Sequence, residues 1–154
     1  MKEEKSPGFN ISSNKAMRIF FEMIESGEEC PMTGTGNSMR PFIKNEDDIL
    51  IMASLKGKPV REGDIILYQR ENGQYVIHRL YKVCPNGTCW FIGDNQFHLE
   101  KNIKQAQLRA RVKYIIKNGK PISCEKGPSR YYFTQRMNFR VLVGKLYDSV
   151  SLFN

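Results

Sequence analysis

Residues 65–83 read IILYQRENGQYVIHRLYKV, and the fold class follows from this stretch. Two runs rich in β-branched and aromatic residues, 65–69 and 75–83, flank the sequence Glu71-Asn72-Gly73-Gln74. An Asn-Gly pair between two such runs is typical of the tight turn in an antiparallel hairpin, because both residues tolerate the backbone conformation of that turn. The sequence therefore predicts two paired strands, and His78 lies inside the second one.

Further short apolar runs surround this hairpin on both sides. Residues 49–53, 88–92 and 108–116 have the composition of strands and are bounded by glycine, asparagine and proline. Pro85-Asn86-Gly87 provides a second turn, which joins 75–83 to 88–92. The body of the chain is therefore predicted to be mainly β.

Helical spacing occurs at both ends of the chain. Between Ser12-Ser13 and Gly27, apolar residues recur at intervals of three and four, which predicts a capped amphipathic helix. From Tyr131 onward the same spacing returns and predicts a C-terminal amphipathic helix. Its predicted apolar side comprises Phe139, Leu142, Val143, Leu146, Val150 and Phe153, and its polar side Arg140, Lys145 and Ser149.

The composition is that of one folded domain. The chain has 154 residues, of which 40% are hydrophobic and 26% charged, which excludes long disorder, a collagen-like repeat and a coiled coil. No apolar run is long enough to cross a bilayer, and the first ten residues, MKEEKSPGFN, do not resemble a signal peptide, so we expect a cytoplasmic protein. We divide it into a flexible N-terminus (1–11), a β domain with its leading helix (12–128) and a basic amphipathic C-terminal helical segment (129–154).

The net charge of +8 is concentrated near the C-terminus. Residues 101–154 contain 12 Lys and Arg but only 2 Asp and Glu. Such a segment favours an anionic partner, and an anionic membrane surface fits its amphipathic helix, which would place the protein peripherally at a membrane. A solubilising basic face is the alternative. Few aromatic residues interleave with the basic ones in 101–130, so the sequence does not favour nucleic acid.

The four cysteines are expected to be free thiols, because no export signal is present. Cys84 and Cys89 flank the Pro85-Asn86-Gly87 turn, and their spacing fits neither a redox pair nor a usual zinc site. The sequence therefore predicts no metal site and no cofactor.

Few residues are available for nucleophilic catalysis, which pairs a hydroxyl or thiol with a base. The only histidines are His78 and His98. Period-two alternation places His78 on the same face as Val76 and Leu80, where it is either a general base or a buried structural histidine. His98 follows a strand in a turn-like segment and is expected to be exposed. Ser38, in Gly34-Thr35-Gly36-Asn37-Ser38, lies in a glycine-rich loop that can expose its hydroxyl and its N–H.

Four blocks of residues together resemble the signal-peptidase-like serine endopeptidases, whose fold is shared with the self-cleaving SOS and phage repressors. The blocks are Ser38-Met39-Arg40-Pro41, Glu62-Gly63-Asp64-Ile65-Ile66, Val76-Ile77-His78-Arg79-Leu80 and Ile92-Gly93-Asp94-Asn95. They occur in the order and at about the spacings of that family, over residues 30 to 117. The resemblance implies a signal-peptidase-like and SOS-repressor-like β-fold, to which the helical spacing adds an N-terminal amphipathic helix and a C-terminal helix.

The resemblance also implies roles for individual residues. Ser38 matches the nucleophile, and His78 stands where some members carry a catalytic lysine and others a histidine, so the base is expected to be imidazole. Asp94 and Glu100 match acidic residues of the family, and we prefer Asp94 as the acid that orients His78. The positions expected to bind the oxyanion or substrate are Gly36, Asn37 and Met39. Because Gly36 has no hydroxyl, the Ser38 backbone N–H is the expected oxyanion donor, with help from Thr35 or Asn37.

The predicted function is a serine endopeptidase without a membrane anchor that cleaves a peptide or precursor protein. The alternative is a non-catalytic peptide-binding or regulatory module on the same fold. The family's signal peptidases carry a membrane anchor ahead of the serine motif, and here only an amphipathic helix precedes it. A DNA-binding helix-turn-helix needs two helices ahead of the β domain, and the sequence predicts one.

Overall fold

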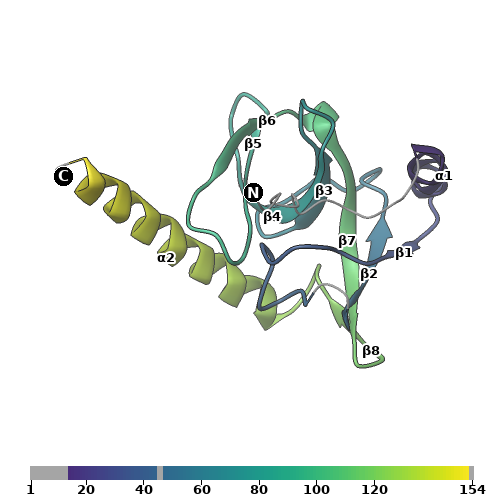
Figure 1. Cartoon of the computed structure of the whole chain (residues 1–154). Helices are drawn as coiled ribbons and strands as arrows, with labels where there is room; N and C mark the ends of the chain where they lie inside the picture. The colour runs from purple at the N-terminus through teal and green to yellow at the C-terminus, as the bar shows by residue number, and fades with distance from the viewer. Residues whose placement is uncertain (1–13, 45–46, 153–154) are drawn as a thin grey trace, which may run out of the picture.

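A computed structural model describes residues 14–44 and 47–152. The predicted flexible segment 1–11 and the predicted helix cap at Ser12 and Ser13 lie outside these residues. The described chain is mainly antiparallel β-sheet with a helix at each end (Figure 1). Its elements are α1 (Asn14–Glu25), β1 (Cys30–Met32), β2 (Ile49–Ala53), β3 (Ile65–Gln69), β4 (Tyr75–Val83), β5 (Cys89–Ile92), β6 (Glu100–Ile103), β7 (Leu108–Lys117), β8 (Lys120–Ser123) and α2 (Pro128–Ser151).

The strands form one sheet in the order β1-β2-β7-β3-β4-β5-β6, and β8 pairs with β7. The hairpin predicted from residues 65–83 is confirmed as β3 and β4, which pair antiparallel with Ile66 opposite His78 and Tyr68 opposite Val76. Tyr68 and His78 are therefore diagonal neighbours on one face of the sheet, close enough for their side chains to interact. The long strand β7 lies between β2 and β3 and pairs with both, so it joins the β1-β2 part of the sheet to the β3-β4-β5-β6 part.

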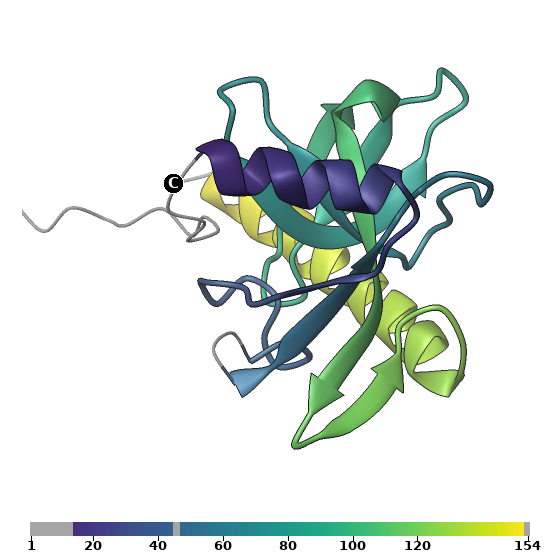
Figure 2. The same cartoon turned by 90° about the vertical axis from the view of Figure 1, so that its right-hand side faces the viewer.

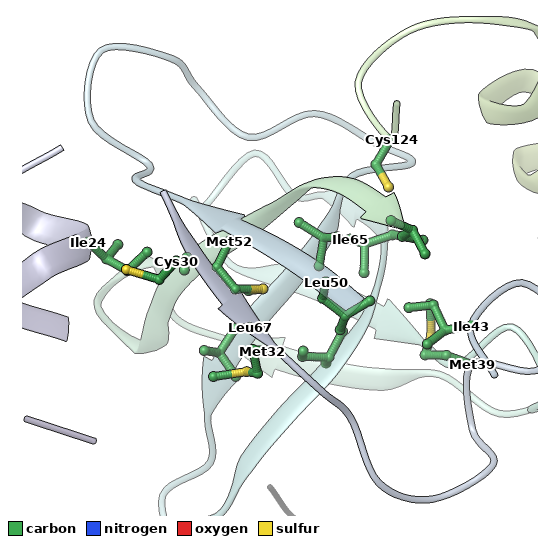
Figure 3. Packing of buried hydrophobic residues seen from close by; sticks show 14 residues of the cluster. Ile24, Cys30, Met32, Met39, Ile43, Leu50, Met52, Ile65, Leu67 and Cys124 are labelled. Carbon is green, nitrogen blue, oxygen red and sulfur yellow. The ribbon is translucent and has the colours of Figure 1, made fainter. Parts of the chain in front are cut away.

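Three clusters of buried side chains hold the sheet and its helices together. The largest cluster lies between α1, the strands and the segment that follows Ser38 (Figure 3). It includes Ile24 from α1, Leu50 and Met52 from β2, and Met39 and Ile43 from the Ser38 segment, all nearly inaccessible to solvent. Each such side chain stabilises the fold by about 1.5–3 kcal/mol. The serine segment is therefore anchored in the hydrophobic core.

Helix α1 ends as its sequence predicts. Gly27 has a φ of +95°, and the Glu28 N–H donates to the Met23 carbonyl at 3.0 Å, which closes the last turn. Met17 and Ile24 are its buried residues. The amphipathic helix predicted between Ser12-Ser13 and Gly27 is thereby confirmed over the described residues.

Helix α2 packs on the side of the sheet opposite α1 (Figure 2). Its buried residues are Met137, Val141 and Gly144, and Gly144 is required because a Cβ there would lie 2.3 Å from the Phe97 carbonyl oxygen. On the apolar side predicted from the sequence, Phe139, Leu142, Leu146 and Val150 are 54–67% exposed, and Phe153 lies outside the described residues. The reason is that α2 carries apolar residues on two opposite faces, and only the other face meets the sheet. In the described residues, no helix has the length and apolar character of a membrane span.

Candidate active site

The Ser38 segment is a tight series of turns that leaves the serine partly exposed. Gly36 has a φ of +89°, which a side chain would strain, and the Arg40 N–H donates to the Asn37 carbonyl at 3.1 Å. After the bend, Met39 and Ile43 are buried in the core. The chain therefore turns outward at Ser38 between a glycine and two apolar anchors.

The Gly93-Asp94-Asn95 block holds this segment by its backbone. The Asn95 N–H donates to the Ser38 carbonyl at 2.8 Å, and the Asn95 side-chain amide donates to the Asn37 carbonyl at 3.3 Å. A Cβ on Gly93 would lie 2.5 Å from the Ser38 carbonyl oxygen, so only glycine permits this approach. The block thus positions the candidate nucleophile through its main chain.

Asp94 binds Arg79 instead of His78, and our preference for Asp94 as the orienting acid is not supported. Its two carboxylate oxygens accept hydrogen bonds from Nε and Nη2 of Arg79, both at 2.7 Å, and both side chains are fully buried. The Arg79 guanidinium also lies over the rings of Phe42 and Phe133. A buried charge needs a partner, and Asp94 provides it for Arg79. Through its contacts with the two rings, Arg79 of β4 also connects the Ser38 segment to α2.

His78 lies on β4 with its side chain buried, and its Nδ1 is 3.1 Å from the hydroxyl oxygen of Tyr68. The Tyr68 hydroxyl in turn donates to Glu100 Oε2 at 2.7 Å. Arg70 donates to both oxygens of Glu100, at 2.8 and 2.7 Å. Of the two acids that the sequence left open, Glu100 is therefore the one connected to His78, and the connection runs through Tyr68.

The environment keeps His78 neutral at physiological pH. Burial lowers the pKa of His78 to about 4, although the negative charge of Glu100 acts in the opposite direction. Burial raises the pKa of Glu100, but the hydrogen bonds from Arg70 and Tyr68 outweigh this and leave the pKa below its usual value. Burial and the bond to Glu100 raise the pKa of the Tyr68 hydroxyl, so it stays protonated. A neutral imidazole has a lone pair that can accept a proton.

Ser38 and His78 line the same cavity, which has a volume of about 200 Å³. Gly36 and Met39, two of the residues expected to bind the oxyanion or substrate, also line it, together with Thr35. The rest of the wall is largely apolar and includes Ile43, Leu50, Val76 and Ile77. Asn37, the third such residue, is an exposed residue of the same bend. The fold therefore brings the predicted nucleophile and the predicted base to one concave site.

His98, expected to be exposed, is confirmed as such, and its Nε2 lies 3.1 Å from the Asp148 carboxylate on α2. All four cysteines are free, as expected. Within residues 14–44 and 47–152, no group of three histidine, cysteine or acidic side chains is arranged to hold a metal.

Sequence reasoning missed Tyr68 and Arg70. Tyr68 belongs to the apolar run 65–69, and Arg70 follows it directly, so both have the pattern of ordinary strand and turn residues. A signal that could have found Tyr68 is the predicted hairpin itself, because its observed register places Tyr68 diagonally across from His78.

Ser38 and His78 thus line one cavity of an antiparallel β-fold. The profile of the family described as Peptidase S24-like matches residues 7–121. The chain therefore belongs to the Peptidase S24-like family. The match contains every candidate site residue and ends within β8, so α2 lies outside it. A search of curated proteins finds no match.

Proposed function

We propose that this protein is a serine endopeptidase in which Ser38 is the nucleophile and His78 the general base. The observation that carries the proposal is that Ser38 and a buried His78 line one cavity. Membership of a peptidase family supports it. A protein or peptide substrate follows from the same membership.

In the proposed reaction, His78 accepts the proton of the Ser38 hydroxyl as its oxygen attacks the scissile carbonyl. The negative charge on the carbonyl oxygen is then stabilised by the Ser38 backbone N–H, since Gly36 supplies no hydroxyl. The protonated His78 returns the proton to the leaving amine, and water releases the acyl group by the reverse sequence. The apolar wall formed by Met39, Leu50 and Ile77 would accept an uncharged side chain next to the scissile bond.

The test compares cleavage of a tryptic peptide library from whole-cell lysate by the wild-type protein and by Ser38→Ala, with new termini identified by mass spectrometry. We expect new termini of one sequence preference with the wild type and none with Ser38→Ala. Ser149→Ala is the matched control, because Ser149 is an exposed residue on α2 whose hydroxyl donates to the Lys145 carbonyl one helix turn earlier. Equal cleavage by wild type and Ser38→Ala would refute the assignment.

Self-cleavage is a second route open to this family fold. Intact-mass measurement of the incubated protein separates the two routes, because self-cleavage shortens the chain itself at a rate independent of protein concentration. Tight binding of a library peptide without any turnover would instead favour the non-catalytic peptide-binding module.

We also propose that α2 docks on an anionic membrane surface. Phe139, Leu142, Leu146 and Val150 form an exposed apolar stripe opposite the face that packs on the sheet. With about 100° between successive residues, Arg136 and Lys145 fall on the two flanks of this stripe. An apolar stripe between basic flanks is the arrangement of helices that lie in the interface of anionic bilayers.

A further inference from the structure

We propose that Tyr68 is a positioning residue that holds His78 in the tautomer with hydrogen on Nδ1, so that Nε2 is the nitrogen that accepts the serine proton. This inference rests on the proposed function and assigns to it a residue outside the four sequence blocks. It also places Glu100 and Arg70 behind Tyr68 in one connected series of side chains.

The position of the hydrogens follows from the contacts. A tyrosine hydroxyl has one hydrogen to donate. The Tyr68 hydroxyl lies 2.7 Å from Glu100 Oε2 and 3.1 Å from His78 Nδ1, and the shorter contact is to the carboxylate. If the hydrogen is donated to Glu100, the Tyr68 oxygen presents only lone pairs to His78, so Nδ1 must carry the hydrogen of that contact.

The reverse arrangement is disfavoured by Glu100. If Tyr68 donated to His78, its oxygen would face the Glu100 carboxylate at 2.7 Å with no hydrogen between them unless Glu100 were protonated. Arg70 prevents that protonation, because its two nitrogens donate to both Glu100 oxygens. The bidentate pair keeps the carboxylate charged and fixes its orientation.

The sheet holds Tyr68 rigidly in this role. Tyr68 has no solvent-accessible surface, and its ring stacks on Phe91 with 4.4 Å between the ring centroids. Backbone pairing of β3 with β4 sets its register relative to His78. The hydroxyl is therefore fixed in place before any substrate binds, as a site that orients its base requires.

The connected side chains of Tyr68, Glu100 and Arg70 also stabilise His78 when it becomes protonated during the reaction. The imidazolium donates its Nδ1 hydrogen to Tyr68, whose oxygen is made a better acceptor by its bond to the Glu100 carboxylate. Glu100 stabilises the positive charge through the hydroxyl without receiving a proton. The intervening hydroxyl keeps the carboxylate farther from the ring than a direct histidine–acid bond would.

The test is 15N NMR of the histidine side chains in the wild-type protein at neutral pH. The chain has only His78 and His98, so a His98→Gln variant assigns both sets of signals. We expect His78 to be neutral with the hydrogen on Nδ1. A neutral His78 with its hydrogen on Nε2, or a rapid mixture of the two tautomers, would overturn the proposal. Because the measurement uses the wild-type protein, it does not depend on whether a Tyr68 variant folds.

Tyr68→Phe gives the second readout, because phenylalanine keeps the stacking and removes only the hydroxyl. We expect the fixed tautomer to be lost and kcat to fall with little change in KM, by less than the roughly 10²–10⁴-fold that a general base contributes. Glu100→Gln retains an acceptor for Tyr68 and should keep the tautomer while lowering kcat. Unchanged kcat in Tyr68→Phe would overturn the positioning role.

Failure of the proposed function gives a different result. If Ser38→Ala cleaved like the wild type, the serine assignment would fall, whereas the His78 tautomer would still be measured independently by NMR. If Ser38→Ala were inactive but Tyr68→Phe fully active, the peptidase would stand and only the role of Tyr68 would fall.

Discussion

His78 links the candidate chemistry to the stability of the fold. Burial lowers its pKa to about 4, whereas a histidine in an unfolded chain titrates near 6.5. Between these values the unfolded chain binds a proton that the folded chain does not, so the free energy of unfolding rises with pH. As the pH falls from about 6.5 to about 4, we expect stability to drop by up to about 3 kcal/mol from this group.

Urea unfolding at several pH values across this window measures the effect. His78→Phe should show a shallower dependence of the unfolding free energy on pH, whereas His98→Gln, which changes an exposed ring, should retain the wild-type slope. An identical slope in His78→Phe and wild type would mean that His78 titrates normally in the folded state.

Neutralising Asp94 is predicted to destabilise the protein much more than neutralising Glu100. Asp94→Asn leaves Arg79 buried without its counter-ion, and such losses cost about 3–5 kcal/mol. Glu100→Gln affects a pair whose members are about one-third exposed and should cost much less stability. Chemical denaturation of the two variants makes the comparison. A stable Asp94→Asn protein would contradict the structural role assigned to this acid.

The site could be predicted from the sequence only as far as its motifs reach. Ser38 and His78 were identifiable because the residues around them carry the family pattern. The choice between Asp94 and Glu100 depends on two contacts, Asp94 with Arg79 and Glu100 with Tyr68. The spacing of residues in the sequence predicts neither contact. Tyr68 has the sequence pattern of a core residue because its ring is part of the core. Only its hydroxyl contacts the site.

At the level of elements, the sequence predicted β2, β3, β4, β5 and β7 and missed β1, β6 and β8. β2, β3 and β4 have the predicted bounds, since five to nine residues give a clear alternation or apolar run. β1, β6 and β8 have three or four residues each, too few to show any period, and each forms by pairing with a neighbouring strand. β5 also has four residues, but the Pro85-Asn86-Gly87 turn before it indicated a strand. The sequence did not predict how α2 packs, because periodicity identifies an apolar face but does not tell which of two faces the sheet will cover.

Gly93→Ala should disturb the site without removing any functional group. The new Cβ would lie 2.5 Å from the Ser38 carbonyl oxygen, so the turn after β5 and the Ser38 segment must separate. A displacement of about 1 Å from productive geometry can lower the rate of an enzyme about 10²-fold. We therefore expect a large loss of kcat/KM in the library-derived peptide assay.

Gly57→Ala is the control for backbone strain. Gly57 has a φ of +73°, but a Cβ there would meet nothing within 4 Å. This variant should lose about 1 kcal/mol of stability and retain its activity. Full activity in Gly93→Ala would show that the contact between the two loops does not position Ser38.

The candidate site and the exposed apolar stripe of α2 belong to different parts of the chain. The cavity that holds Ser38 and His78 belongs to the part matched by the family, whereas α2 follows it and extends beyond the strands at its C-terminal end (Figure 1). The basic excess of residues 101–154 and the exposed stripe on α2 are found in the same part of the chain. Charge alone would attract any polyanion, but an exposed apolar stripe also requires a partner that accepts hydrocarbon.

Membrane docking through α2 is tested by sedimentation with lipid vesicles. We expect the protein to sediment with phosphatidylserine-containing vesicles and much less with pure phosphatidylcholine, and added salt should weaken the binding. The double variant Leu142→Ser and Leu146→Ser removes two exposed side chains worth about 1.5–3 kcal/mol each, so partitioning should fall at least about 100-fold. Because both leucines are more than half exposed, the variant should retain the wild-type stability. Equal sedimentation of the wild type and the double variant would refute an apolar contact with the bilayer. If the wild type bound neither type of vesicle, a membrane would be refuted as the partner of α2.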